Sequence, residues 1–399
     1  MRLFLALYAA ALLLLSPVLS LWLDEILTLI GAVKPDLETL LAYVGTAPGG
    51  TPLAFLAPRW SMQLFGPSVF AARLPSALAS IAACPAIYSL AKRLGLRTPI
   101  LAVVVFALWP LQLRYAMEAR PYALALALSV WSTEVFLSLP ERPHRKWLYI
   151  ALTVLAALAQ PYALFVTGVH LLYGRLPLVA AGISALVLLP WYAHFRAAWA
   201  PVNSVQQLAT FDPKSALAFL HEISGSGYTG TAILAAGIVL SVPRRFWLLS
   251  IAVPVAAVFA ANGVLHYFFA TRQLIFILPA LALLFVSGTT GPGRGKAAWL
   301  LLAAFLSASI YEDIQWFRKP RENWQAAADA IQREVVSGAC VQFQGDSTPV
   351  YEFFHPSLAQ HHCAGPSGYV VTGTSSYVSA QLPAGRVLDF NGPRVIIQK

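Results

Sequence analysis

The sequence predicts a polytopic α-helical membrane protein that carries a small α/β domain at its C-terminal end. Hydrophobic residues make up 58% of the 399 residues and charged residues only 11%, whereas about a quarter of the residues in a soluble domain are charged. Apolar runs near bilayer length recur up to about residue 311 and then stop. The net charge of +10 does not indicate nucleic-acid binding, because the basic residues are scattered between apolar runs.

The apolar runs predict about eleven transmembrane helices. Their approximate ranges are 3–22, 68–91, 98–113, 122–139, 147–160, 162–174, 177–193, 230–242, 246–265, 273–290 and 297–311. Pro161 and Pro177 interrupt the middle of the chain, so the span boundaries between residues 147 and 195 stay open. The first run resembles a signal peptide, but its length of about eighteen residues exceeds the usual 7–15, which favours a retained helix over cleavage.

Basic residues fall on alternate connectors between the spans and mark one side of the membrane. They are Arg2, Lys92, Arg93, Arg97, Arg142, Arg145, Lys146, Arg175, Arg244, Arg245, Arg294 and Lys296. Cytoplasmic loops carry an excess of Lys and Arg, so this side is predicted to be cytoplasmic. The N-terminus then lies in the cytoplasm, and the C-terminal domain lies on the periplasmic or extracellular side of the inner (plasma) membrane.

Two connectors on the outer side are long. The first, residues 23–67, contains ILTLIGAV and LETLLAYV, which predict short helices that lie along the membrane interface. The third outer connector, residues 194–229, is polar and rich in Gly and Ser near HEISGSGYTG, which predicts a mobile loop.

The composition divides the chain into a membrane domain, residues 1–311, and a small outer α/β domain, residues 312–399. Within RENWQAAADAIQREV, the predicted helix places Trp324, Ala328, Ile331 and Val335 on one face. The runs CVQFQ, GYVVTG, RVLDF and RVIIQ predict strands. Cys340 and Cys363 would share an oxidising compartment, and the sequence leaves open whether they form a disulfide.

A carboxylate pair, Asp24 and Glu25, follows the first predicted span. A carboxylate that is partly removed from water has a raised pKa, which suits a general base. The pair also fits the ordinary end of a helix in water, so the motif alone does not decide between the two interpretations.

The second outer connector, RYAMEARPY, brings charges to the membrane edge. It is very short and contains Arg114, Glu118 and Arg120, and Pro121 fixes the backbone before the next helix. A guanidinium held there by an acid suits binding of a phosphate. Arg272 lies at similar depth, before a late span. Extension to lipid headgroups explains any one arginine, and we expect it for Arg114, but the acid beside Arg120 favours a functional site.

In order along the chain, these motifs resemble the GT-C membrane glycosyltransferases, in the branch with the protein O-mannosyltransferases and the aminoarabinose transferase of lipid A. The matching features are Asp24-Glu25, TPLAFLAPRWSMQLFGPSVFAARLPSAL with Arg73, EARPYAL with Glu118, Arg120 and Tyr122, TRQLIFILP with Arg272, and NWQAAADAI. The resemblance covers roughly the first 335 residues. Members often have a His where this chain has Gly50-Thr51-Pro52, and Thr-His-Tyr where it has Gln160-Pro161-Tyr162.

The resemblance implies the GT-C fold and an inverting glycosyltransferase. The donor would be a sugar on a polyprenyl phosphate, and the acceptor a hydroxyl on a lipid, glycan or protein. Asp24 would be the catalytic base, and the substrate-binding residues would be Glu25, Arg73, Glu118, Arg120, Tyr122 and Arg272. No metal or other cofactor is expected, because arginines can stabilise a monophosphate leaving group without one, although a divalent cation stays open. The missing histidines argue against a His-dependent contact with a metal or with the acceptor, and nucleic acid is not an expected partner.

Two alternatives remain. A transporter or flippase of a lipid-linked sugar would use the same basic residues, but such proteins usually show repeated halves with interrupted helices near the midplane. No internal repeat stands out in this sequence, and its charges gather at one face. An inactive partner subunit is the second alternative.

Overall fold

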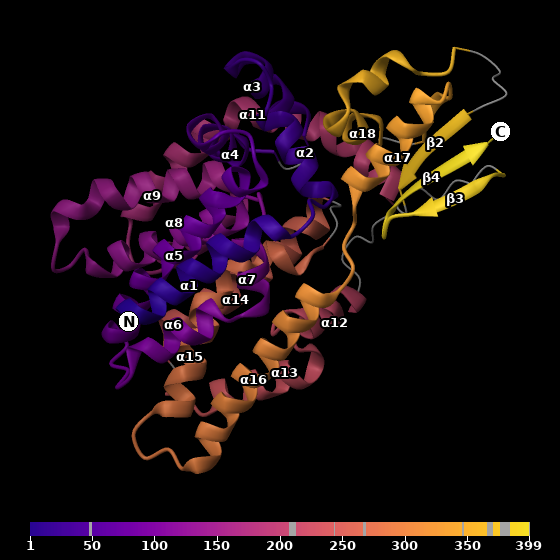
Figure 1. Cartoon of the computed structure of the whole chain (residues 1–399). Coiled ribbons are helices and arrows are strands. Elements are labelled where there is room, and N and C mark those ends of the chain that lie inside the picture. The colour runs from indigo at the N-terminus through magenta and orange to yellow at the C-terminus, as the bar shows by residue number, and fades with distance from the viewer. Residues whose placement is uncertain are drawn as a thin grey trace.

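Helices form the body of the molecule, and a small sheet lies at one end of it (Figure 1). The computed structural model of the chain describes residues 1–47, 50–206, 213–242, 244–265, 269–344, 347–364, 370–375 and 384–398. Of residues 192–206 it describes the backbone only.

A helix occupies most of every predicted span. These helices are α1 (Arg2–Leu15), α5 (Val69–Arg93), α6 (Pro99–Ala107), α7 (Pro110–Ala116), α8 (Tyr122–Ser138), α9 (Lys146–Ala159), α10 (Leu164–Leu171), α11 (Leu176–Gln206), α13 (Gly227–Val239), α14 (Arg245–Leu265), α15 (Leu278–Thr290) and α16 (Lys296–Arg318). Within the described ranges, 4 helices are long and apolar enough to cross a membrane, or up to 6 if each bent pair is one span. The number of eleven crossings therefore stays a prediction.

Two predicted spans are bent. The first ends early, in η1 (Ser16–Val18), and the chain then turns by 91° into α2 (Leu23–Ala32). The third breaks before Pro110, and α6 and α7 meet at 66°, because proline has no amide hydrogen to donate and disfavours helix at the residue before it. Asp24 and Glu25 therefore begin a helix, whereas we expected them directly after the end of one.

The outer connectors contain helices. α2 and α3 (Leu37–Thr46) confirm the two short helices predicted in the first connector, and α4 (Pro52–Phe65) follows them. The third connector was predicted to be a loop, but α11 continues to Gln206 and α12 (Pro213–Glu222) occupies its second half. Residues 207–212 of that connector lie outside the described residues.

The C-terminal part has the predicted helix and four predicted strands. α17 (Trp324–Val336) buries Trp324, Ala328, Ile331 and Val335, and α18 (Thr348–Phe354) follows. The strands are β1 (Cys340–Phe343), β2 (Val370–Ser375), β3 (Arg386–Asp389) and β4 (Pro393–Gln398), in the order β1-β2-β4-β3. β1 and β2 pair in parallel, whereas β4 pairs antiparallel with β2 and with β3. Cys340 and Cys363 form a disulfide, which resolves the alternative that the sequence left open.

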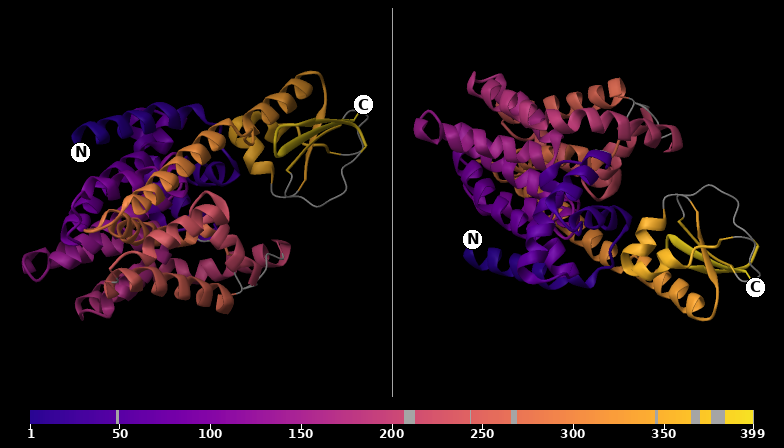
Figure 2. Two further views of the ribbon diagram at one scale, coloured as in Figure 1. Left: turned by 90° about the horizontal axis from the view of Figure 1, so that it is seen from below. Right: turned by 90° about the horizontal axis from the view of Figure 1, so that it is seen from above.

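The two predicted domains share structure at their boundary. Ile26 of α2 is buried in one apolar cluster with Trp324 of α17 and Tyr351 of α18. α16 runs past residue 311 to Arg318 and reaches from the helical body towards the sheet (Figure 2). α2 therefore belongs to the core of the C-terminal part as much as to the membrane part.

Candidate active site

Three charged side chains from distant segments meet at the start of α2. The Oδ2 atom of Asp24 lies 3.4 Å from Nη2 of Arg120 and 3.6 Å from Nη2 of Arg272. The side chains of Asp24, Arg120 and Arg272 are 26%, 19% and 24% exposed. The structure thus brings together three of the predicted site residues, and all three remain open to a ligand.

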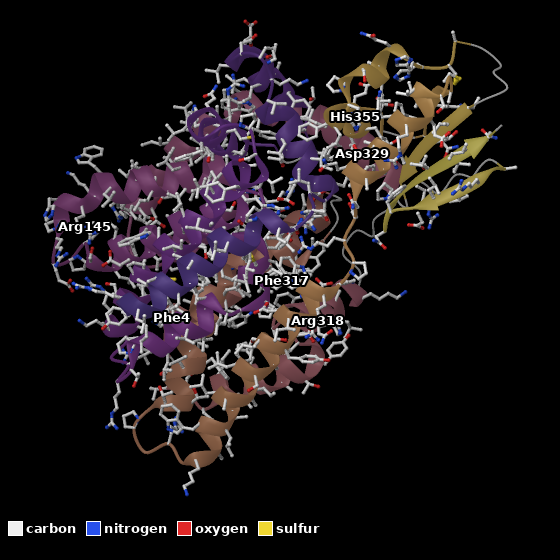
Figure 3. All side chains as sticks on the ribbon, in the orientation of Figure 1. Phe4, Arg145, Phe317, Arg318, Asp329 and His355 are labelled. Carbon is white, nitrogen blue, oxygen red and sulfur yellow. A yellow bond between two sulfur atoms is a disulfide. The ribbon has the colours of Figure 1, made fainter. Side chains whose placement is uncertain are left out.

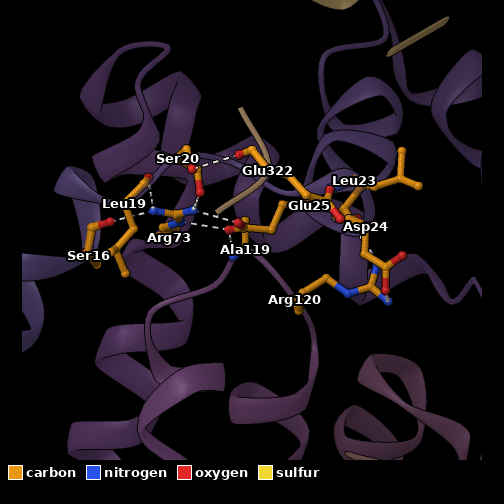
Figure 4. Close-up of polar contacts among 11 residues, drawn as sticks. Ser16, Leu19, Ser20, Leu23, Asp24, Glu25, Arg73, Ala119, Arg120 and Glu322 are labelled. Carbon is orange, nitrogen blue, oxygen red and sulfur yellow. Dashed lines mark hydrogen bonds and ion pairs between the residues drawn. The ribbon is translucent and has the colours of Figure 1, made fainter. Parts of the chain in front are cut away.

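Arg120 is oriented by α2. Its Nη1 donates to the carbonyl of Asp24 at 3.0 Å and to the hydroxyl of Thr28 at 3.0 Å, and Figure 4 shows it beside Asp24. The Thr28 hydroxyl in turn donates to the Asp24 carbonyl at 2.9 Å. Thr28 was not predicted as a site residue, although its spacing of four residues places it on the same helix face as Asp24.

Arg272 is oriented by an aromatic hydroxyl. Its Nε donates to the hydroxyl of Tyr122 at 3.1 Å, and the Arg120 guanidinium lies 5.7 Å from the centre of the same ring. Tyr115 packs against Tyr122 with ring centres 4.7 Å apart. Tyr122 therefore contacts both arginines, as expected of a residue that belongs to the same site.

The segment that carries Arg272 is anchored on both sides of it. Arg272 lies in η4 (Thr271–Ile277), the entry to the largely buried helix α15. The hydroxyl of Thr271 donates to Glu222 of α12 at 2.6 Å, and Asn262 of α14 donates to the side-chain oxygen of Gln273 at 2.7 Å. These anchors were not apparent from the sequence, because their partners lie in separate helices.

Glu25 and Arg73 form a closed ion pair. Both side chains are 0% exposed, with Glu25 Oε2 2.6 Å from Arg73 Nη2. Arg73 also donates to three carbonyls at the end of the first span, and Glu25 accepts the backbone N–H of Ala119 at 2.7 Å (Figure 4). The two residues were predicted to bind substrate, but in this structure neither is open to a ligand. They join the end of the first span to the second outer connector.

Glu118 contacts Arg120 through its backbone carbonyl, which accepts the Arg120 N–H at 2.8 Å, and among the described contacts its carboxylate makes no hydrogen bond to the Arg120 guanidinium. The side chain is 7% exposed, and among the described residues its Oε2 has no hydrogen-bond partner. Burial raises the pKa of Glu118 to about 8, the Glu25 charge adds to this shift, and Arg321, Arg73 and Arg120 oppose it. The side-chain hydrogen bonds that orient Arg120 come from Asp24 and Thr28, whereas we expected Glu118 to provide them.

Arg114 also differs from its prediction. Its guanidinium lies 5.8 Å from the ring centre of Trp316 in α16, and its Nε is buried. The side chain therefore packs against a neighbouring helix, whereas we expected it to extend to lipid headgroups.

This chain departs from the family that it resembles at Gly50-Thr51-Pro52 and at Gln160-Pro161-Tyr162, and these two segments lie next to each other. The hydroxyl of Thr51 donates to the carbonyl of Ala159, which directly precedes Gln160, at 2.9 Å. In the part of the chain that the structure describes, no group of three or more His, Cys, Asp or Glu is placed to hold a metal ion. Independence from metal remains a prediction.

Comparisons with known proteins agree with the resemblance that the motifs carry. A family model described as dolichyl-phosphate-mannose-protein mannosyltransferase matches residues 48–194. No curated protein sequence matches the chain.

Solved structures share the fold. The structure of ArnT from Cupriavidus metallidurans bound to undecaprenyl phosphate matches with a TM-score of 0.61 and 12% identity, over 99% of this chain and 97% of that one. Its apo state matches with a TM-score of 0.60 and 12% identity over the same 99% and 97% of the two chains. Arabinofuranosyltransferase AftD from Mycobacteria matches with a TM-score of 0.50 and 19% identity, over 86% of this chain and 30% of that one.

Proposed function

We propose that this chain, which has the membrane fold of the GT-C glycosyltransferases, transfers a sugar from a polyprenyl-phosphate donor to a hydroxyl acceptor. The observation that carries the proposal is the convergence of Asp24, Arg120 and Arg272 at one partly exposed point. The relative bound to undecaprenyl phosphate supports the class of donor. The sugar, hexose or pentose, and the acceptor, lipid, glycan or protein, are left open.

The two arginines would hold the donor phosphate. Guanidinium groups present paired donors that match phosphate oxygens, and such charge-assisted bonds are strong. In the structure the terminal nitrogens of Arg120 and Arg272 face Asp24 at 3.4 and 3.6 Å, longer than direct hydrogen bonds. A phosphate would compete for these nitrogens and leave the Asp24 carboxylate available for the acceptor.

The reaction then needs one proton acceptor and one stabilised leaving group. The acceptor oxygen forms a bond to the anomeric carbon, and the bond from that carbon to the phosphate oxygen breaks with inversion. The hydroxyl proton moves to the Asp24 carboxylate, and the electron pair leaves with the polyprenyl phosphate. Arg120 and Arg272 stabilise the negative charge that develops there, and Tyr122 steadies Arg272.

We place this site on the outer face of the inner membrane. The proposal follows the basic connectors that mark the opposite side as cytoplasmic, and the Cys340–Cys363 disulfide supports an oxidising compartment for the C-terminal part. Cysteine labels at positions 145 and 344 should react from the cytoplasm and from the outside, respectively. Labelling of position 145 from outside would contradict the orientation.

Lipid-linked sugar profiling of cells with and without the gene tests the function. Loss of the gene should cause one polyprenyl-phosphate sugar to accumulate, and wild-type protein but not Asp24→Asn should reverse this. An unchanged profile would contradict the proposal.

An assay of undecaprenyl phosphate release by the purified protein distinguishes a transferase from a transporter. In detergent, a transferase releases undecaprenyl phosphate from one member of a panel of undecaprenyl-phosphate sugars when cell-envelope extract supplies the acceptor. A transporter moves the donor without breaking the sugar–phosphate bond, so it would release none.

A further inference from the structure

The catalytic helix α2 has no capping side chain of its own. The residue at its N-cap position is Trp22, and in the described chain this side chain makes no capping hydrogen bond. Helix N-termini leave several backbone N–H groups without partners, which Ser, Thr, Asp or Asn usually satisfies. The first turn of α2 therefore needs a hydrogen-bond acceptor from another segment.

Glu322, from the segment between α16 and α17, provides that acceptor. Its Oε2 accepts the backbone N–H of Leu23, the first residue of α2, at 3.0 Å across 299 positions of sequence. The same oxygen accepts the indole N–H of Trp324 at 2.8 Å. A carboxylate at this position is also favoured by the partial positive charge of a helix N-terminus.

The backbone around Glu322 is fixed as well. The hydroxyl of Ser20 donates to the Glu322 carbonyl at 2.9 Å, as Figure 4 shows, and the N–H of Asn323 donates to the carbonyl of Phe390 at 3.0 Å. The carboxylate is thus held between the start of α2 and the sheet of the C-terminal part.

We infer that Glu322 is a positioning residue for Asp24, through which the C-terminal part holds the catalytic helix in register with the two arginines. This inference rests on the proposed function. Asp24 directly follows Leu23, and its contacts with Arg120 and Arg272 depend on the first turn of α2 keeping its place. Misplacement of a reacting group by about 1 Å costs on the order of 10²-fold in rate.

Three variants of the full chain test the inference. Glu322→Ala removes the acceptor, while Glu322→Gln keeps an oxygen that can accept both N–H groups. Asp329→Ala is the matched control, because this carboxylate is 41% exposed and pairs with His355 at 2.6 Å in the same C-terminal part (Figure 3). The readouts are kcat and KM for whichever undecaprenyl-phosphate sugar the wild type turns over, together with affinity for undecaprenyl phosphate.

Glu322→Ala should lower kcat by about 10- to 100-fold and change the donor KM by less than about 3-fold, since Arg272 keeps its hydrogen bond to Tyr122, outside α2. Glu322→Gln should keep most of the activity, and Asp329→Ala should match the wild type. A purely structural role would lower the yield of folded protein without separating kcat from KM. An unchanged kcat in Glu322→Ala would overturn the inference.

Hydrogen exchange gives a readout that does not depend on activity. Peptides that cover residues 20–30 should exchange faster in Glu322→Ala than in the wild type, and Glu322→Gln and Asp329→Ala should show little change. Equal exchange in Glu322→Ala and the wild type would overturn the inference. If the wild type released undecaprenyl phosphate from no donor, the proposed function would fail, while the exchange comparison would still test the cap.

Discussion

Asp24 and Glu25 are neighbours in one helical turn, yet their surroundings differ. Glu25 is 0% exposed and bonded to Arg73 at 2.6 Å, with its second oxygen accepting a backbone N–H. Asp24 is 26% exposed and faces Arg120 at 3.4 Å and Arg272 at 3.6 Å. Adjacent helical residues point about 100° apart, so one acid enters the protein and the other faces the open site.

The difference separates two uses of an acid with arginine. A fully bonded, buried pair has no hydrogen-bonding capacity left for a ligand, and removing one partner leaves an uncompensated charge. A partly exposed carboxylate with arginines at longer range leaves both donors and acceptor available for exchange. Mutations at the two acids should therefore affect different properties, activity at Asp24 and stability at Glu25.

The largest expected effect is on turnover at Asp24. Asp24→Asn keeps the shape of the side chain and removes its affinity for a proton, so the rate of undecaprenyl phosphate release should fall by about 10²–10⁴-fold. Melting temperature and affinity for undecaprenyl phosphate should change little, because the side chain is partly exposed. Near wild-type turnover in the purified variant would eliminate Asp24 as the base.

The next largest effect is a graded loss of donor affinity and turnover in variants of the second outer connector. Arg120→Ala removes charge and hydrogen bonds, so donor affinity and turnover should both fall steeply, and Arg120→Lys should stay clearly impaired because it loses the planar fork. Arg114→Ala is the matched control and should be the mildest, since Arg114 packs on Trp316. Wild-type turnover in Arg120→Lys would contradict the phosphate-binding interpretation. Equal losses of turnover in Arg120→Ala and Arg114→Ala would also contradict it.

Variants of the buried Glu25–Arg73 ion pair should lower the stability of the protein. Glu25→Ala should destabilise the protein by about 3–5 kcal/mol, because it leaves buried Arg73 unpaired. The double variant Glu25→Leu with Arg73→Met should lose less than the sum of the two single changes. Thermal unfolding in detergent measures both. If Glu25→Ala kept wild-type stability and lost only donor binding, the contrast between the two acids would be reversed.

Local sequence signals predicted most of the elements. Apolar length and periodicity identified the helices and the four strands, because these signals act over neighbouring residues. They missed the 91° turn after η1, since LSPVLSLWLDE stays apolar through the bend. The third outer connector was read as a loop from its Gly and Ser content, although α12 forms within it.

The site was predicted in part. Asp24, Arg120, Tyr122 and Arg272 meet as the ordered motifs suggested, and their roles stay proposals. The Arg120 guanidinium hydrogen-bonds to α2 where we expected the Glu118 carboxylate, because proximity in sequence does not fix where two side chains point. Glu322 carries no local signal, since its partner lies 299 residues away.

The smallest expected effect concerns Glu118, the third acid near the site. Burial raises its pKa from 4.5 to about 8. Between these values the folded protein keeps the proton and the unfolded chain releases it, so unfolding releases a proton and stability falls as pH rises. The contribution is fully present below pH 4.5 and is lost as the pH rises through 8.

Glu118→Gln should flatten this dependence, because the amide does not titrate. Between pH 5 and pH 8 its melting temperature should fall less than that of the wild type, by roughly 1–3 °C given the size of the chain. Glu141→Gln is the control of opposite sign, since its hydrogen bond to Arg93 lowers the pKa of Glu141. That acid stabilises at higher pH and loses its contribution as pH falls, so its removal should leave the pH 5–8 slope unchanged. Parallel melting curves for wild type and Glu118→Gln across this window would show that Glu118 is ionised in the folded protein and has a partner there.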